Sequence, residues 1–90
     1  METTQVQVEI RVQVSFYSYF KDLTGCPDTI EVVAAGETLG DLFEKLSSRF
    51  PRLAAMRNST LIAVGVDYQN RSYILKPGDE VSLFPPVQGG

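Results

Sequence analysis

The sequence predicts an α+β fold, in which one main helix crosses one face of a mixed sheet of four to five strands. Two strand patterns at the N-terminus, a single amphipathic helical stripe and a strand pattern near the C-terminus predict it. The chain has 90 residues, enough for one modest core. We expect a single domain over residues 1–90, with a flexible N-terminal extension at residues 1–5 and a C-terminal tail at residues 85–90.

The first two strands are predicted from residues 6–16 and 29–34. Apolar residues occupy every second position of the first run, the period of a strand with one wet face: Val6, Val8, Ile10, Val12, Val14 and Phe16. The run is about twice the usual strand length, so only its second half need belong to the core. Residues 17–28 carry turn residues, and the second strand has Ile30 and Val32 on one face. Their short separation favours an antiparallel pair.

A helix is predicted over residues 38–50. Thr38 is a good N-cap, and Asp41 three residues later forms an approximate capping box with it. The helix carries an apolar stripe, which we expect to pack on the sheet: Leu39, Leu42, Phe43, Leu46 and Phe50. Pro51 ends the helix, because the residue before a proline resists helical dihedral angles.

The remaining segments are shorter. Residues 51–59 are interpreted as a connector with about one helical turn, and Arg49, Arg52 and Arg57 as a solvated face. We expect a buried strand at residues 61–66, a turn at 67–71, a short edge strand at 72–75 and a type II turn at 76–79.

The last strand, at residues 81–84, is stopped by Pro85 and Pro86, which cannot donate to a ladder. The first strand is its natural neighbour. The predicted order is β-β-α-β-β-β, which is a β-grasp, or ubiquitin-like, arrangement.

Composition excludes several classes of function. The net charge is −3, and eight basic residues are scattered among eleven acidic ones, which argues against nucleic acid as a partner. No apolar run is long enough for a bilayer and no signal peptide is recognised, so we expect no membrane partner and a cytoplasmic location.

The chain has few groups for catalysis. It has no histidine and one cysteine, Cys26, interpreted as a small loop residue, so we expect no metal site, no internal disulfide and no Ser-His-Asp triad. It has no GxxxxGK[ST] loop, so any ATP must be bound by a partner. We expect this chain to bind no cofactor and not to be an enzyme on its own.

Residues 75–90 carry the most specific motif. They read Leu75-Lys76-Pro77-Gly78-Asp79-Glu80-Val81 and then, after two residues, Phe84-Pro85-Pro86-Val87-Gln88-Gly89-Gly90. This resembles the L-x-x-G-D-E-V-x-x-F-P-P-V-x-G-G ending of the MoaD/ThiS family of sulfur carriers, most closely its MoaD-type branch, the small subunits of molybdopterin synthase. Weaker similarities lie at Phe16-Tyr17, at residues 21–25, at residues 38–42 and at Phe50-Pro51.

The resemblance implies a mechanism centred on the carboxylate of Gly90. A partner of the E1-like, MoeB type binds ATP and adenylates this carboxylate, and sulfur then replaces AMP to give a thiocarboxylate. The loaded tail enters the large, MoaE-type subunit and donates sulfur to cyclic pyranopterin monophosphate in molybdenum cofactor synthesis. The six tail residues reach at most about 20 Å when extended: Pro85, Pro86, Val87, Gln88, Gly89 and Gly90.

The resemblance also implies a surface that binds both partners, made of Tyr17, Lys21, Tyr68 and Phe84. Tyr17 alternates with Phe16, so we expect it on the face away from the helix, where an exposed aromatic is suited to an interface. Ordinary edge aromatics are the alternative. Lys21 stands where the family commonly has arginine, and it lacks the bidentate geometry of arginine.

Three other functions stay open. The chain is alternatively a sulfur carrier for another pathway, such as thiamine thiazole synthesis or tRNA thiolation. It is alternatively a ubiquitin-like protein modifier. In the non-chemical alternative it is a ubiquitin-like interaction domain whose Gly89-Gly90 ending is incidental.

Overall fold

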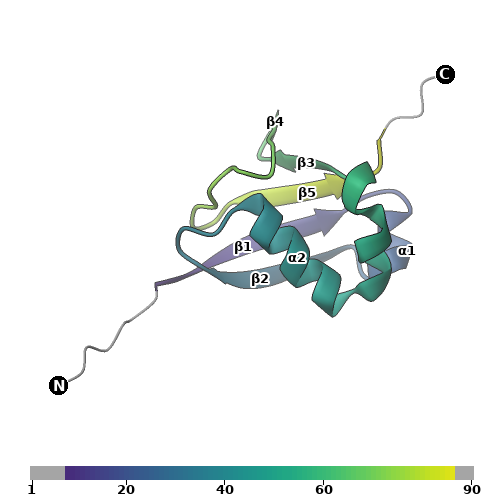
Figure 1. The fold of residues 1–90 in the computed structure, drawn as a ribbon, viewed down its shortest axis with the longest axis horizontal. Helices are drawn as coiled ribbons and strands as arrows, with labels where there is room; N and C mark the ends of the chain where they lie inside the picture. The colour runs from purple at the N-terminus through teal and green to yellow at the C-terminus, as the bar shows by residue number, and fades with distance from the viewer. Residues whose placement is uncertain (1–7, 87–90) are drawn as a thin grey trace.

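The computed structural model describes residues 8–86. They form a five-stranded mixed sheet with one long helix across one face (Figure 1). The elements in chain order are β1 (Glu9–Phe16), α1 (Phe20–Thr24), β2 (Asp28–Ala34), α2 (Leu39–Arg49), the 3-10 helix η1 (Pro51–Ser59), β3 (Leu61–Val64), β4 (Asp67–Tyr68) and β5 (Glu80–Phe84). The predicted α+β class is confirmed.

The sheet has the strand order β2-β1-β5-β3-β4. The first strand, β1, pairs antiparallel with β2 and parallel with β5, so the expected pairing of the first and last strands is confirmed. β3 is antiparallel to both β5 and β4. In Figure 1 the yellow β5 lies between β1 and β3, and its last residue leads into the tail motif.

The core lies between the sheet and α2. The inward side of β1 is buried at Ile10, Val12, Val14 and Phe16, as its alternation predicts. The helical stripe meets it with four buried side chains, Leu39, Leu42, Phe43 and Leu46. Each fully buried Leu or Phe contributes about 1.5–3 kcal/mol relative to an exposed one, so this packing accounts for most of the helix's stability.

The boundaries of α2 follow from local chemistry. The backbone N–H of Asp41 donates to Thr38 Oγ1 at 3.2 Å, and the N–H of Thr38 donates to Asp41 Oδ2 at 3.0 Å. The predicted capping box is therefore present. Phe50 follows the helix as its C-cap. Its ring packs edge-on against that of Phe16, with ring centroids 5.8 Å apart.

Several predictions of local structure were wrong. Residues 17–28 contain the helix α1, whose five residues are too few to show a helical period in the sequence. The strand expected at residues 61–66 ends at Val64, so the turn falls at Gly65 and Val66, and residues 67–71 begin with the two-residue strand β4. Residues 72–75 do not form an edge strand; Ile74 makes one isolated bridge with Thr38, because Tyr73 O and Leu75 N bond to the segment that enters α2. In addition, η1 extends over nine residues, longer than the single turn expected.

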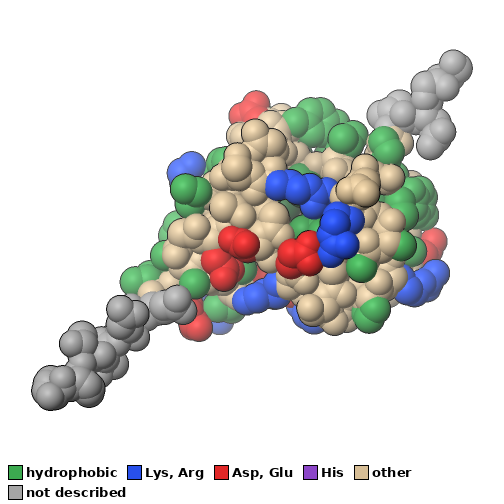
Figure 2. Space-filling view, in the orientation of Figure 1, with side chains coloured by type: hydrophobic (Ala, Val, Ile, Leu, Met, Phe, Trp, Pro, Cys, Tyr) green, Lys and Arg blue, Asp and Glu red, His purple; other side chains and the backbone are tan. Residues whose placement is uncertain are grey.

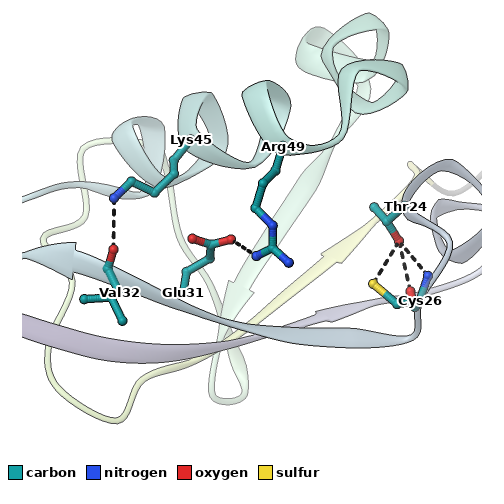
Figure 3. A network of polar contacts seen from close by, with 6 residues as sticks. All are labelled: Thr24, Cys26, Glu31, Val32, Lys45 and Arg49. Atoms are coloured by element: carbon teal, nitrogen blue, oxygen red, sulfur yellow. Dashed lines mark hydrogen bonds and ion pairs between the residues drawn. The ribbon is translucent and has the colours of Figure 1, made fainter.

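The two faces of β2 are unequal. Ile30 and Val32 share a face as predicted, but it is the outer face, where Ile30 is 56% exposed. The inward face carries Val33 and Glu31, and Glu31 is only 6% exposed. Its carboxylate forms an ion pair with Arg49 of α2 (Figure 3). The inward charge has its partner on the helix that covers it.

The arginines of α2 and η1 are not simply a solvated face. Arg57 donates to both carboxylate oxygens of Glu44, at 2.9 and 2.8 Å. These hydrogen bonds, and then the charges of Arg57 and Arg71, lower the pKa of Glu44. Figure 2 shows acidic and basic side chains next to one another on this face. Arg49 and Arg57 are therefore both paired within the chain.

Replacing Arg49 by alanine is expected to lower the free energy of unfolding by about 1–3 kcal/mol, because it leaves the buried Glu31 carboxylate without its partner. Because Arg49 is half-exposed, water can hydrate the Glu31 carboxylate after the substitution. The loss of unfolding free energy is therefore smaller than for a fully buried ion pair. Urea denaturation of the variant and of Arg52→Ala tests this, since among residues 8–86 the Arg52 side chain hydrogen bonds only to the Asp22 carbonyl, at 3.5 Å. Equal losses in the two variants would show that the ion pair contributes nothing specific.

Candidate functional site

The site is described here up to the first residues of the C-terminal tail. Pro85 and Pro86 follow β5 directly and are half-buried. Val87, Gln88, Gly89 and Gly90, which carry the predicted chemistry, lie outside the described residues. The geometry below therefore concerns the strand that leads to the tail and the surface around its end.

The turn before β5 explains the glycine and aspartate of the motif. Gly78 has φ +81°, a conformation that L side chains rarely adopt, and Asp79 N–H donates to Lys76 O at 3.1 Å. The Asp79 carboxylate accepts from Lys76 N at 2.9 Å and from the Tyr73 hydroxyl at 3.0 Å. The predicted type II turn is present, and both residues serve to shape it.

This turn also sets β5 against β1. Gly78 N–H donates to Arg11 O, and Gln13 N–H donates to Asp79 O, both at 2.9 Å. The parallel register then follows, with Val14 opposite Val81 and Phe16 opposite Leu83. β5 is the central strand of the sheet, and its end, which leads into the tail, is thus held against β1.

Three of the predicted partner-binding residues lie together at this end of the sheet. Tyr17 stacks on Phe84 with ring centroids 5.3 Å apart, and Tyr68 meets Phe84 edge-on at 5.9 Å. Tyr17 is 46% exposed and Tyr68 is 68% exposed. Tyr17 therefore lies on the outer face, as its alternation with Phe16 predicts.

Leu61 extends this surface and was missed from the sequence. It is the register partner of Phe84 on β3, so the two side chains share the outer face, and it is exposed. The continuous apolar run at residues 61–66 favoured burial on both faces and hid it. We call Tyr17, Leu61, Tyr68 and Phe84 the aromatic patch.

Lys21 is placed differently from the other three. It lies on α1, beyond a bend at Ser18, which has a left-handed φ of +58°. Its exposed side chain makes no hydrogen bond or ion pair with any residue in the described range 8–86. The structure does not join Lys21 to the aromatic patch.

Cys26 is a loop residue, as its sequence context indicates. It is partly buried against the core, and its thiol donates to Thr24 Oγ1 at 3.8 Å (Figure 3). Within residues 8–86, no group of three or more His, Cys, Asp or Glu side chains is arranged to hold a metal ion. No helix in the same range is long and apolar enough to cross a membrane.

Comparison with known proteins places this geometry in a family. Residues 14–90, which include the end of β1, all of β5, the aromatic patch and the glycine ending, match the ThiS family. The chain belongs to the ThiS family. Its match extends through Gly90, so this ThiS-family chain keeps the family's ending as well as its scaffold.

Two curated relatives of this ThiS-family chain bear the name molybdopterin synthase sulfur carrier subunit. The human protein is 32% identical, and the match covers 89% of this chain and 94% of the relative. The Escherichia coli K12 protein is 33% identical, and the match covers 88% of this chain and 99% of the relative.

Solved structures agree with the fold. A putative molybdopterin converting factor, subunit 1, from Pyrococcus furiosus aligns with a TM-score of 0.75 at 26% identity, over 87% of this chain and 99% of that one. A ubiquitin from Caldiarchaeum subterraneum aligns with a TM-score of 0.64 at 13% identity, over 92% of this chain and all of that one. The ThiS-family chain therefore has the predicted ubiquitin-like β-grasp fold.

Proposed function

We propose that this chain is the sulfur carrier subunit of molybdopterin synthase, and that the carboxylate of Gly90 carries the sulfur. The match to the ThiS family through Gly90 is the observation that carries this proposal. Relatives at 32% and 33% identity, each matched over nearly its whole length, bear that name. The chain is then a sulfur-donating subunit, and the catalysis belongs to its partners.

The chemistry needs two partners. A free carboxylate is a poor acyl donor, because oxide would have to leave. An E1-like adenylyltransferase of the MoeB type, which binds the ATP, converts the Gly90 carboxylate to an acyl-adenylate. The outer sulfur of a persulfide donor attacks the carbonyl carbon, and AMP leaves with the electron pair of the broken bond, which gives an acyl disulfide. A thiol then attacks the donor's own sulfur in that S–S bond, forms a disulfide with the donor and releases the thiocarboxylate. The requirement for ATP favours a cytoplasmic setting.

The second partner is the large subunit, of the MoaE type, in whose active site the thiocarboxylate gives its sulfur to cyclic pyranopterin monophosphate. Two features of the chain suit this delivery. Pro85 and Pro86 restrict the backbone where the tail leaves β5, and Gly89 and Gly90 have no Cβ to obstruct a narrow channel. The aromatic patch is centred on Phe84, the residue directly before the tail, so a protein that takes the tail is expected to cover the patch as well.

Incubating the full chain with an activating enzyme, ATP and a sulfur donor is expected to raise its intact mass by the difference between a sulfur and an oxygen atom. Fragmentation is expected to locate the gain at Gly90, because no other backbone group of the chain is a free carboxylate in this proposal. The control is a carrier known to be loaded by the same enzyme. Loading of the control without any gain on this chain contradicts the proposal.

The client pathway needs a separate measurement. The loaded chain is expected to convert cyclic pyranopterin monophosphate to molybdopterin when the large subunit is added. Sulfur transfer only in a thiazole-forming or tRNA-thiolating reaction would keep the carrier chemistry and assign another client. Attachment of the chain to lysine side chains would instead identify a ubiquitin-like modifier.

A further inference from the structure

A polar depression lies on the outer face of the sheet, beside the aromatic patch. Its volume is about 250 Å³. The residues that line it come from β1, β5, the residue after β1 and the β3–β4 turn: Gln13, Ser15, Tyr17, Gly65, Glu80 and Ser82. Tyr17 belongs to both surfaces, so the depression and the aromatic patch are continuous.

Strand register creates this depression. Parallel pairing puts Gln13 opposite Glu80 and Ser15 opposite Ser82, so the four side chains share the outer face. The two serines are small and form the floor between the larger side chains of Tyr17 and Gln13. Gly65 has φ +62° and open space where a Cβ would stand, so the β3–β4 turn leaves the rim unobstructed.

The polar side chains around this depression have unused hydrogen-bonding capacity. Gln13, Ser15, Glu80 and Ser82 make no side-chain hydrogen bond to any other residue between 8 and 86. The neighbouring Asp79 differs, because both the Lys76 N–H and the Tyr73 hydroxyl bond to its carboxylate. The carboxylate of Glu80 is therefore available to a ligand.

Glu80 supplies the charge of this depression. It is exposed, and the five other lining residues are uncharged. Arg11, one outward position before Gln13, lines an adjoining hollow with Ile30 and Gly78, and this hollow shares Gln13 and Glu80 with the depression. Within residues 8–86, Arg11 forms no ion pair with Glu80. The depression itself offers a carboxylate, two hydroxyl groups and an amide oxygen as acceptors.

We propose that this depression receives an arginine side chain of the protein that docks on the aromatic patch. A guanidinium group pairs in a bidentate way with a carboxylate such as that of Glu80, and its remaining N–H groups reach hydroxyl and amide oxygens. The Tyr17 ring at the wall adds an aromatic surface of the kind that arginine favours. The inference rests on the proposed function, because the docking protein is the large synthase subunit.

Interface dimensions explain why the docking protein reaches this depression. Ser82 and Glu80 lie two and four residues before Phe84, or about 7 and 13 Å along β5. A protein interface of ordinary size covers about 800 Å² per partner, a disc of about 16 Å radius. A partner centred on the aromatic patch therefore covers Glu80, and a covered carboxylate requires a cationic partner to offset its lost hydration.

Replacing Glu80 by glutamine is expected to weaken binding of the full chain to its large synthase subunit about tenfold. It is also expected to reduce the dependence of affinity on salt, because the substitution keeps the shape and removes the charge. Calorimetric titration of the purified subunits at low and high salt measures both quantities. The matched control is Glu9→Gln, an exposed carboxylate on the same face of β1 that does not line the depression.

A second variant tests whether the partner needs the volume of the depression, instead of the charge of Glu80. Ser82→Leu fills the floor of the depression, and at this outward position it is expected to weaken binding by a similar factor without lowering the unfolding temperature. Wild-type affinity in both Glu80→Gln and Ser82→Leu overturns the proposal, as does equal weakening by Glu9→Gln. If either result is obtained but Tyr17→Ala still weakens binding, only the arginine proposal is overturned and the proposed function stands. If the wild-type chain does not bind the large subunit at all, the arginine proposal and the proposed function are both overturned.

Discussion

A chain extended by one alanine after Gly90 is expected to lose sulfur transfer, by at least about 100-fold. The extension converts the Gly90 carboxylate into an amide and moves the new terminal carboxylate by up to about 3.5 Å. A misplacement of about 1 Å at a reacting centre already costs about 100-fold in rate. Intact mass after incubation with the activating enzyme, ATP and a sulfur donor measures the loss as the absence of a sulfur-containing product.

Two further variants control for the extension. Deleting Gly90 is expected to have the same effect, because the carboxylate is then displaced in the opposite direction. A tag of similar size before Met1 is expected to leave loading unchanged, and the unfolding temperature of all three chains is expected to match the wild type. Full loading of the extended chain would show that Gly90 is not the attachment point. The alternative of a non-chemical interaction domain predicts that the extension is harmless.

The fold was predictable where hydrophobic patterns are long. The alternation in β1 and the stripe of α2 each include several residues, so side-chain burial decides their structure and the prediction agrees. The type II turn at residues 76–79 was also predictable, because proline and glycine restrict the backbone locally. Short elements such as α1 and β4 depend on tertiary contacts, which no local pattern records.

The ion pair between Glu31 and Arg49 shows a second limit of prediction from sequence patterns. The alternation in residues 29–34 identifies two faces but does not say which one is buried. Exposed Ile30 and buried Glu31 reverse the simplest assignment, because the edge strand β2 receives an ion-pair partner from α2. Lys45 of the same helix also donates to the Val32 carbonyl at 2.9 Å, on the free edge of β2 (Figure 3).

The candidate site was predictable only in part. Tyr17, Tyr68 and Phe84 were all predicted from the family resemblance, and only the outward orientation of Tyr17 followed from its alternation with Phe16. The structure adds Leu61 through the β3–β5 register. The polar depression depends on parallel pairing of Gln13 with Glu80, two residues far apart in the chain, and sequence patterns do not specify this register.

Replacing Phe84 by alanine is expected to weaken binding to the large synthase subunit by about 30- to 300-fold. Phe84 is the ring on which both Tyr17 and Tyr68 pack, so its loss removes the centre of the aromatic patch. Central aromatic residues of an interface commonly contribute about 2 kcal/mol or more to binding. Because its side chain is already partly exposed, its removal affects binding of the partner more than stability of the free chain.

Val32→Ala is the matched control for Phe84→Ala. Val32 is also an exposed apolar residue on the outer face, but it lies on β2, at the opposite edge of the sheet from Tyr68, and it lines neither the polar depression nor the hollow beside it. Calorimetric titration is expected to show nearly unchanged affinity for Val32→Ala. If Phe84→Ala lowers the free energy of unfolding and leaves affinity intact, the rings are ordinary edge aromatics and the partner binds elsewhere. Weakened affinity with an intact fold identifies the aromatic patch as the surface that brings the tail to its partner.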